Sequence, residues 1–263
     1  MNLFSSDKMF NSTINVFQSC IFVGLLLFAT SSVLAQQRGK SQNKLMIQFE
    51  NYVGNDLIKM DTAHYKNELG QSFTVTNFKY YISNIRLIES DGKSYISNEY
   101  FLINEDDNET KLIELKNIPE GEYTAISFMI GVDSLHNCSG AQSGALDPAG
   151  GMFWVWNTGY IFMKLEGKSP ASQSPGQMFE YHIGGFKSPA NCIRIVSLPF
   201  ENKLIFSNNK AALTIKSDVL EILKTPVNID FSDLSSVTDF HNATKVADNY
   251  SDMFSILSFK PTK

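Results

Sequence analysis

The chain has 263 residues, of which 43% are hydrophobic and 19% are charged, and its formal net charge is −5. This is an ordinary globular composition, and the length is sufficient for one large all-β domain. Because an acidic chain is repelled by phosphates and no basic stripe is visible, the composition excludes nucleic acid as a partner.

Residues 1–35 have the pattern of a secretory signal peptide. They contain a long apolar stretch, and Ala35 ends a small-x-small cleavage site before Gln36. Near the N-terminus, Asp7 offsets the positive charge of Lys8, whereas a signal peptide normally begins with a positively charged region. The alternative is therefore an uncleaved membrane anchor of about 20 residues. Such an anchor would be the only contact of the chain with a membrane. We therefore expect an exported protein, periplasmic, secreted or at the cell surface, with a polar linker at 36–44.

Strand patterns with turn signals between them follow at regular spacing. Leu45, Ile47 and Phe49 alternate with residues that face the other side, which is typical of a half-buried strand. The expected strands cover residues 45–50, 73–76, 78–88, 95–96, 100–103, 112–115, 123–132, 179–185, 192–198, 203–206 and 212–215. The acidic segment 105–109 lacks the ligand alternation and glycine of an EF-hand, so a solvated turn is expected there.

Two helical signals come late in the chain. Asp218 with Glu221 is typical of a helix N-terminus, and it predicts a short turn through Leu223. Apolar residues from Val246 to Leu257 follow the i, i+3, i+4, i+7 spacing of an amphipathic helix that closes the chain. The predicted fold class is therefore all-β, an antiparallel β-sandwich with long loops and a short C-terminal helix.

The most distinctive stretch holds both tryptophans of the chain. Two dense aromatic runs, 152–156 and 160–163, are separated by Asn-Thr-Gly, which predicts a hairpin with its glycine in the left-handed region. Period-two geometry puts Met152, Trp154 and Trp156 on one face of that hairpin. We call residues 152–163 the tryptophan hairpin.

A long loop over residues 133–151 leads into this hairpin and carries His136 and Cys138. Loops of this length in compact domains are usually functional or disordered. In an exported chain, Cys138 and Cys192 should form a disulfide, which would stabilise the fold by roughly 4 kcal/mol. The alternative is a cysteine-containing metal site, although neither cysteine has a ligand partner at a recognised metal spacing.

The sequence lacks the common enzyme motifs. There is no nucleophile elbow, phosphate loop, His-Glu-x-x-His or Cys-x-x-Cys, so hydrolase and kinase chemistry is unsupported. Four histidines remain as candidate metal ligands, and the chain would hold copper if imidazoles, methionines and tryptophans converged on one site. For any one histidine, a hydrogen-bonded or surface role is the alternative.

Seven ordered blocks resemble the MbnP-like domain family, which is named for a periplasmic protein associated with methanobactin copper uptake. The blocks are residues 78–84 (FKYYISN), 130–133 (IGVD), 144–148 (GALDP), 151–160 (GMFWVWNTGY), 165–167 (LEG), 181–184 (YHIG) and 247–249 (ADN). The resemblance implies one all-β sandwich domain over residues 45–263 and an extracytoplasmic copper-binding function.

The resemblance also implies particular metal ligands. His182 matches the Tyr-His-x-Gly block directly and is the first ligand expected. His136 lies in the loop where relatives carry an Asn-His pair, although the order here is His136-Asn137. His241 falls outside the matching blocks, but its position just before the final helix would let it reach the site.

Trp154 and Trp156 match the Trp-x-Trp block of the family. In some relatives, histidines bind copper together with a tryptophan oxidised to kynurenine, and a dihaem enzyme of the cytochrome c peroxidase type carries out that oxidation. Two neutral imidazoles suit a low-coordinate cuprous site. An unmodified indole gives at best a weak π contact, whereas the oxidised amine is a true donor.

These observations predict a non-catalytic copper-binding protein with a His/Trp site, used in copper acquisition or handling. A competing hypothesis is a cell-surface recognition module in which Trp154, Trp156 and Tyr160 form an exposed platform for carbohydrate or a protein partner. It requires solvent-facing rings. A third interpretation treats the tryptophan hairpin as plain core, and it requires buried rings far from any histidine.

Overall fold

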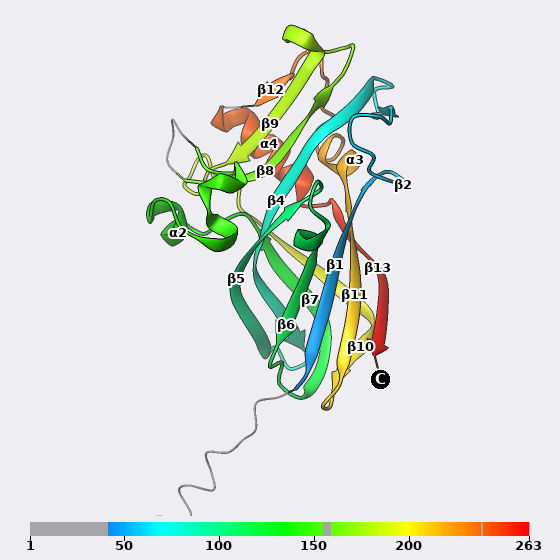
Figure 1. The fold of residues 1–263 in the computed structure, drawn as a ribbon, viewed down its shortest axis with the longest axis vertical. Coiled ribbons are helices and arrows are strands. Elements are labelled where there is room, and N and C mark those ends of the chain that lie inside the picture. Colours follow the sequence, from blue (N-terminus) through cyan, green and yellow to red (C-terminus); the bar gives the residue numbers. More distant parts are fainter. Residues whose placement is uncertain (1–41, 155–158, 238, 263) are drawn as a thin grey trace, which may run out of the picture. The chain divides into compact units, whose positions relative to one another are not determined.

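The computed structural model describes residues 42–154, 159–237 and 239–262 (Figure 1). The predicted signal peptide and most of the predicted linker lie outside this range. The strands are β1 (Lys44–Val53), β2 (Asp56–Leu57), β3 (Tyr65–Lys66), β4 (Ser72–Glu89), β5 (Ser94–Asn104), β6 (Leu112–Lys116), β7 (Gly121–Ile130), β8 (Ile161–Lys168), β9 (Met178–Gly184), β10 (Arg194–Phe206), β11 (Lys210–Asp218), β12 (Ser236–Val237) and β13 (Phe254–Thr262).

Helices are few and short. They are α2 (Ser134–Cys138), α3 (Val219–Ile222) and α4 (Phe240–Tyr250), with 3-10 turns η1 (Asn108–Lys111), η2 (Gly144–Leu146), η3 (Pro148–Gly150) and η4 (Pro175–Gln177). In the described part of the chain, no helix is long and apolar enough to cross a membrane. The Asp218 side chain accepts a hydrogen bond from the backbone N–H of Leu220, which confirms the predicted cap of α3.

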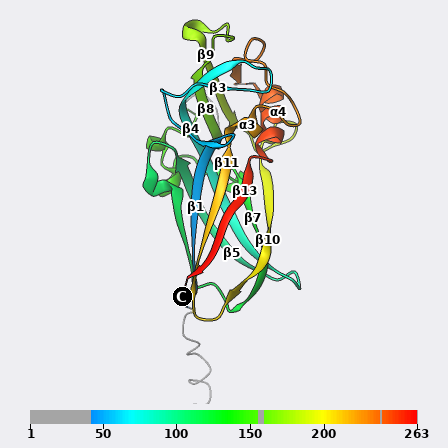
Figure 2. The same cartoon turned by 90° about the vertical axis from the view of Figure 1, so that its right-hand side faces the viewer.

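The strands form two sheets, and the predicted β-sandwich is confirmed (Figures 1 and 2). One sheet has the order β13-β11-β1-β2, with β6 also paired to β1, and the other has the order β10-β7-β4-β8-β9-β12, with β3 and β5 also paired to β4. Both sheets are mixed, because β1 runs parallel to β11 and β9 runs parallel to β12. All other pairs are antiparallel, as expected.

The 18-residue strand β4 connects the two halves of the larger sheet. It merges two strands that the sequence predicted separately. Its C-terminal half pairs with β5 and β7, whereas its N-terminal half pairs with β8. The second arm of the tryptophan hairpin continues into β8. The hairpin therefore lies next to the junction between the two halves of the larger sheet.

Aromatic rings from both sheets meet in the core. Phe49 of β1 packs edge-on against Tyr80 of β4, Phe128 of β7 and Phe254 of β13, with centroid separations of 6.3, 6.1 and 6.1 Å. All four side chains are at most 6% exposed. Edge-to-face contacts of this kind add about 0.5–1.5 kcal/mol each to the burial of apolar area.

The C-terminal helix α4 is confirmed, but it does not close the chain. Strand β13 follows it and pairs with β11. A register shift between Thr214 and Ile215 leaves Leu257 of β13 without a Cα partner on β11, so a β-bulge interrupts the alternation of Phe254 and Ile256. The bulge disrupts the two-residue alternation that identifies a strand in the sequence. For this reason the predicted helix ran on to Leu257, into residues that form β13.

Candidate metal site around the tryptophan hairpin

The two arms of the tryptophan hairpin pair with each other in the described residues, and residues 155–158 between them lie outside that range. Phe153 and Tyr160 form an antiparallel bridge, and the backbone N–H of Trp154 donates to Gly159 O at 3.1 Å. Gly159 has a φ of +93°, as the prediction required. Met152 and Trp154 are both buried, at 0% and 8% exposure. Trp156 lies outside the described residues, so its place on their face stays a prediction.

Trp154 lies beside His182 of strand β9. Their ring centroids are 6.1 Å apart, with an interplanar angle of 53°. Gly184 makes this approach possible, because a Cβ there would lie 2.6 Å from Tyr160 O and 3.2 Å from Nε1 of Trp154. The glycine that ends the Tyr-His-Ile-Gly block therefore lets β9 lie against the tryptophan hairpin.

His182 is held by a carboxylate. Its Nε2 lies 2.6 Å from Oε1 of Glu166 on β8, and the other oxygen of Glu166 accepts a hydrogen bond of 3.0 Å from the Asn77 amide. The hydrogen bond from His182 is the main reason why the pKa of Glu166 lies below its usual value. Within the described residues, Nδ1 of His182 has no hydrogen-bond partner. This nitrogen can therefore act as a ligand.

His136 is held in the same way from a different element. Asp133 caps α2, and its Oδ2 lies 3.0 Å from Nδ1 of His136 and accepts a hydrogen bond from the Tyr100 hydroxyl. The Tyr100 oxygen is also 2.8 Å from Nδ1 of His136. Burial raises the pKa of Asp133, but the hydrogen bonds from Tyr100 and His136 outweigh it and the net shift is downward. Nδ1 is thus occupied, whereas Nε2 has no hydrogen-bond partner in the part of the chain that the structure describes and can act as a ligand.

Helix α2 is anchored to the tryptophan hairpin through the residue after His136. Asn137 is 1% exposed, and its Oδ1 accepts the backbone N–H of Tyr160 at 2.9 Å. Its amide donates to the carbonyls of Val132 and Asp133. The His136-Asn137 order therefore buries the amide against the tryptophan hairpin and keeps the half-buried imidazole nearer the surface.

The other two histidines are exposed. His241 is in the first turn of α4, which packs beside β9 (Figure 1). Val237 aligns with Tyr181 in the parallel β12–β9 pair. His64 lies in the loop before β3. No group of three or more His, Cys, Asp or Glu side chains in the described residues could hold a metal ion.

Sequence reasoning missed the side chains that orient the two histidines. Glu166 and Asp133 are the carboxylate partners, and Tyr100 and Asn77 extend the two networks. Asp133 stands directly before helix α2, at the N-cap position, where aspartate is a preferred residue. This signal was available in the sequence. Glu166 contacts His182 only through the register of β8 and β9, which pairs Glu166 with Glu180 and Lys164 with His182.

The predicted disulfide was wrong, because Cys138 and Cys192 are both free thiols. Cys138 is exposed at the end of α2, whereas Cys192 is fully buried, and its carbonyl accepts a hydrogen bond from the Tyr250 hydroxyl. Burial raises the pKa of the Cys192 thiol to about 12. One thiol on a surface helix and one inside the core do not meet, although export alone would favour their oxidation.

A sequence model of the MbnP family matches residues 42–242. Among solved structures, the fold is similar to MbnP from Methylosinus trichosporium, with a TM-score of 0.50 and 13% sequence identity. The match covers 84% of this chain and 99% of that one. At this identity the likeness shows the fold alone. No curated protein sequence matches the chain.

Proposed function

The chain belongs to the MbnP family, and we propose that it is a non-catalytic, extracytoplasmic copper-binding protein that acts in copper acquisition or handling. The observation that carries the proposal is the pair of oriented imidazoles. His182 and His136 each have one ring nitrogen against a carboxylate and the other open. Metal-ligating histidines almost always have such an outer partner, which fixes the ring and increases its basicity as a ligand.

The donor types suit copper. Neutral imidazole is a good copper ligand, and two of them meet the low coordination number of the cuprous ion. Both histidines lie on elements that contact the tryptophan hairpin, His182 through Trp154 and His136 through Asn137. We propose His182 and His136 as ligands. His241, the third histidine predicted from the sequence, forms no three-residue metal-binding group with them within the described residues.

The tryptophans are the second part of the proposal. An indole N–H has no lone pair to offer a metal, but oxidation to kynurenine creates an amine that does. The contact between Trp154 and His182 would put that amine beside a ligand imidazole. We therefore propose Trp154, with Trp156 as the alternative, as the residue oxidised by a dihaem partner enzyme of the cytochrome c peroxidase type.

The two competing interpretations receive less support. A recognition platform requires solvent-facing rings, but Trp154 is 8% and Tyr160 is 1% exposed. A plain core hairpin requires rings remote from any histidine, whereas Trp154 packs against His182. The extracytoplasmic location rests on the signal-peptide pattern of residues 1–35.

The test is Cu(I) affinity of the mature chain, measured by competition against a chromogenic chelator. His182→Ala and His136→Ala are each expected to weaken binding by at least about 100-fold, because losing a ligand costs more than losing its outer partner. Both variants should remain folded, although His182→Ala loses the hydrogen bond to Glu166 and should unfold at a lower temperature than the parent. His64→Ala is the matched control, because it removes an exposed imidazole from the loop before β3.

Mass analysis of tryptophan in protein from its native host completes this test. A mass change from oxidation at Trp154, together with tighter copper binding than the unmodified recombinant chain, would support the kynurenine proposal. If neither form binds copper, or if His64→Ala weakens binding as much as His182→Ala, the proposed site is wrong.

A further inference from the structure

The sandwich has two open sides, and each lies between an edge strand of one sheet and an edge strand of the other. On one side β10 lies near β13, and on the other side β5 lies near β6. The backbone groups on the outer edge of such strands are unpaired and can accept another strand. Natural proteins block edges that they do not use, so the two sides are worth comparing.

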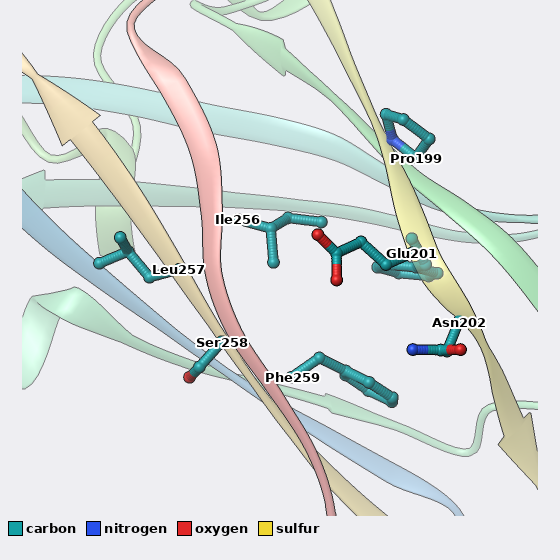
Figure 3. A pocket seen from close by; sticks show the side chains of 8 residues that line it. Pro199, Glu201, Asn202, Ile256, Leu257, Ser258 and Phe259 are labelled. Atoms are coloured by element: carbon teal, nitrogen blue, oxygen red, sulfur yellow. The ribbon is translucent and has the colours of Figure 1, made fainter.

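The side between β10 and β13 is blocked. Pro199 lies within β10, and a register shift after it leaves residues 200–203 without partners on β7. Phe200 then stacks on Phe259 of β13, with centroids 5.9 Å apart and planes at 23°. The Glu201 carboxylate points into the small remaining hollow of about 180 Å³ (Figure 3). Proline, bulges and inward charges are the devices that protect an edge.

The side between β5 and β6 is open. Two adjoining hollows of about 390 and 310 Å³ follow each other along these strands, the first lined by residues 95–99 and 114–117 and the second including residues 100–102 and Leu112. Strand β6 pairs with β1 without interruption and contains no proline. On its outer edge, the Leu112 N–H donates to Glu109 O and the Lys116 carbonyl accepts from the Tyr95 hydroxyl, so the free backbone groups are centred on Glu114. The side chains of Ile96 and Leu112 are 44% and 48% exposed beside it.

The charges of this groove favour a cationic occupant. Glu99 lines the first hollow and Asp147 lines the second, and neither is in an ion pair within the described residues. Glu114, in contrast, is neutralised by Lys44 and Lys116, at 2.8 and 2.7 Å. A bulge in β5 at Asn98 and Glu99 also lies at the groove, and bulges often re-aim a side chain beside a binding site.

We propose that the β5–β6 groove binds an extended segment of a partner protein, which adds as a short strand to the edge of β6 at Glu114. Successive side chains of a strand alternate between its two faces, so residues i, i+2 and i+4 of the segment would enter the groove. Cationic side chains at positions i and i+4 of the segment would pair with the carboxylates of Glu99 and Asp147. An apolar side chain at i+2 would pack against Leu102 and Leu112. This inference does not rest on copper binding.

The experiment uses the metal-free mature chain and a peptide that carries fluorescein at its N-terminus, fluorescein-Lys-Ser-Val-Ser-Lys-amide, in an anisotropy titration at low salt. Saturable binding is expected, and Glu99→Gln and Asp147→Asn should each raise the dissociation constant about 2- to 5-fold, the range for one exposed ion pair. Glu201→Gln is the matched control, because it neutralises a carboxylate on the blocked side. Hydrogen exchange of the β6 amides should slow when the peptide binds.

Three results would overturn the proposal. One is an absence of saturable binding up to ~1 mM peptide, which corresponds to about −4 kcal/mol. A second is equal binding of the Glu-Ser-Val-Ser-Glu counterpart, which would remove the charge argument. The third is a concentration-dependent dimer, seen by sedimentation, whose formation protects β6 and excludes the peptide, because the occupant would then be a second copy of the chain.

Discussion

A single carboxylate decides which nitrogen of His182 faces a ligand. Glu166 engages Nε2 at 2.6 Å, so the ring is fixed as a donor toward β8 and keeps its lone pair at Nδ1. Asp133 does the reverse for His136, where Nδ1 is engaged and Nε2 is open. The two proposed ligands thus differ in the ring nitrogen they present, although both are oriented by an acid.

Removing the charge of Glu166 should therefore weaken copper binding without removing a ligand. Glu166→Gln is expected to lower Cu(I) affinity about 10- to 100-fold, the usual effect of losing an outer-shell partner. Glu180→Gln is the control, because Glu180 is the cross-strand neighbour of Glu166 on β9 and its exposed side chain has no hydrogen bond within the described residues. Equal losses in both variants would show that net charge, and not orientation of His182, governs affinity.

The same carboxylate predicts a pH dependence of stability. The pKa of Glu166 in the folded chain lies below its usual value of 4.5, chiefly because of the hydrogen bond from His182. A depressed folded-state pKa means that the carboxylate stabilises the fold above pH 4.5, and that this contribution is lost as the pH falls below 4.5. In urea unfolding between pH 7 and 3, the stability difference between the parent and Glu166→Gln should shrink only at the acid end.

At the scale of elements, the tryptophan hairpin is held from two sides. Strand β9 approaches it at Gly184, and α2 is bonded to it through Asn137. Both contacts need close backbone approach, since a Cβ on Gly159 would lie 2.3 Å from the Asn137 oxygen. The glycines of the two matching blocks are therefore explained by packing around Trp154.

Gly184→Ala should separate β9 from the tryptophan hairpin. The added methyl group would meet the Tyr160 carbonyl at 2.6 Å, and relieving this clash is expected to cost about 1–3 kcal/mol of unfolding free energy. Copper affinity should fall as well, because Trp154 and His182 move apart. Gly121→Ala is the matched control, since its Cβ would lie 3.4 Å from the movable side chain of Glu89. Denaturant unfolding that shows equal stability for both variants would contradict the packing explanation.

At the scale of the whole molecule, a buried polar network joins the two sheets. The Tyr80 hydroxyl donates to Asn51 at 2.9 Å, the Asn51 amide donates to Glu105 at 2.8 Å, and Glu105 pairs with Lys111 at 3.0 Å. The two charged side chains are only 12% and 11% exposed. The solvated turn predicted for residues 105–109 was therefore wrong at Glu105.

Breaking this pair should destabilise the entire sandwich. Lys111→Met leaves Glu105 as a nearly buried, uncompensated charge, and it is expected to cost about 3–5 kcal/mol. Lys203→Met breaks the exposed pair with Glu122, where each side chain is 53% exposed, and should cost less than about 1 kcal/mol. The measurement is the free energy of urea unfolding, and similar losses in both variants would contradict the role of the internal network.

Local patterns in the sequence determined several elements of this protein. The alternation of Leu45, Ile47 and Phe49 predicted β1, the Asp218 cap predicted α3, and the Asn-Thr-Gly turn predicted the tryptophan hairpin with its left-handed Gly159. These features depend on backbone preferences and on side-chain periodicity within a few residues, which the sequence contains directly.

Tertiary structure decided the rest. Glu166 meets His182 only through the register of two strands, Glu105 is buried by a strand far away in the chain, and Cys192 enters a core that Cys138 does not reach. The bulge at Leu257 likewise concealed β13. Each of these outcomes depends on which distant segments pack together. Burial of the whole core determines that packing, and the periodicity of a short stretch of sequence carries no information about it.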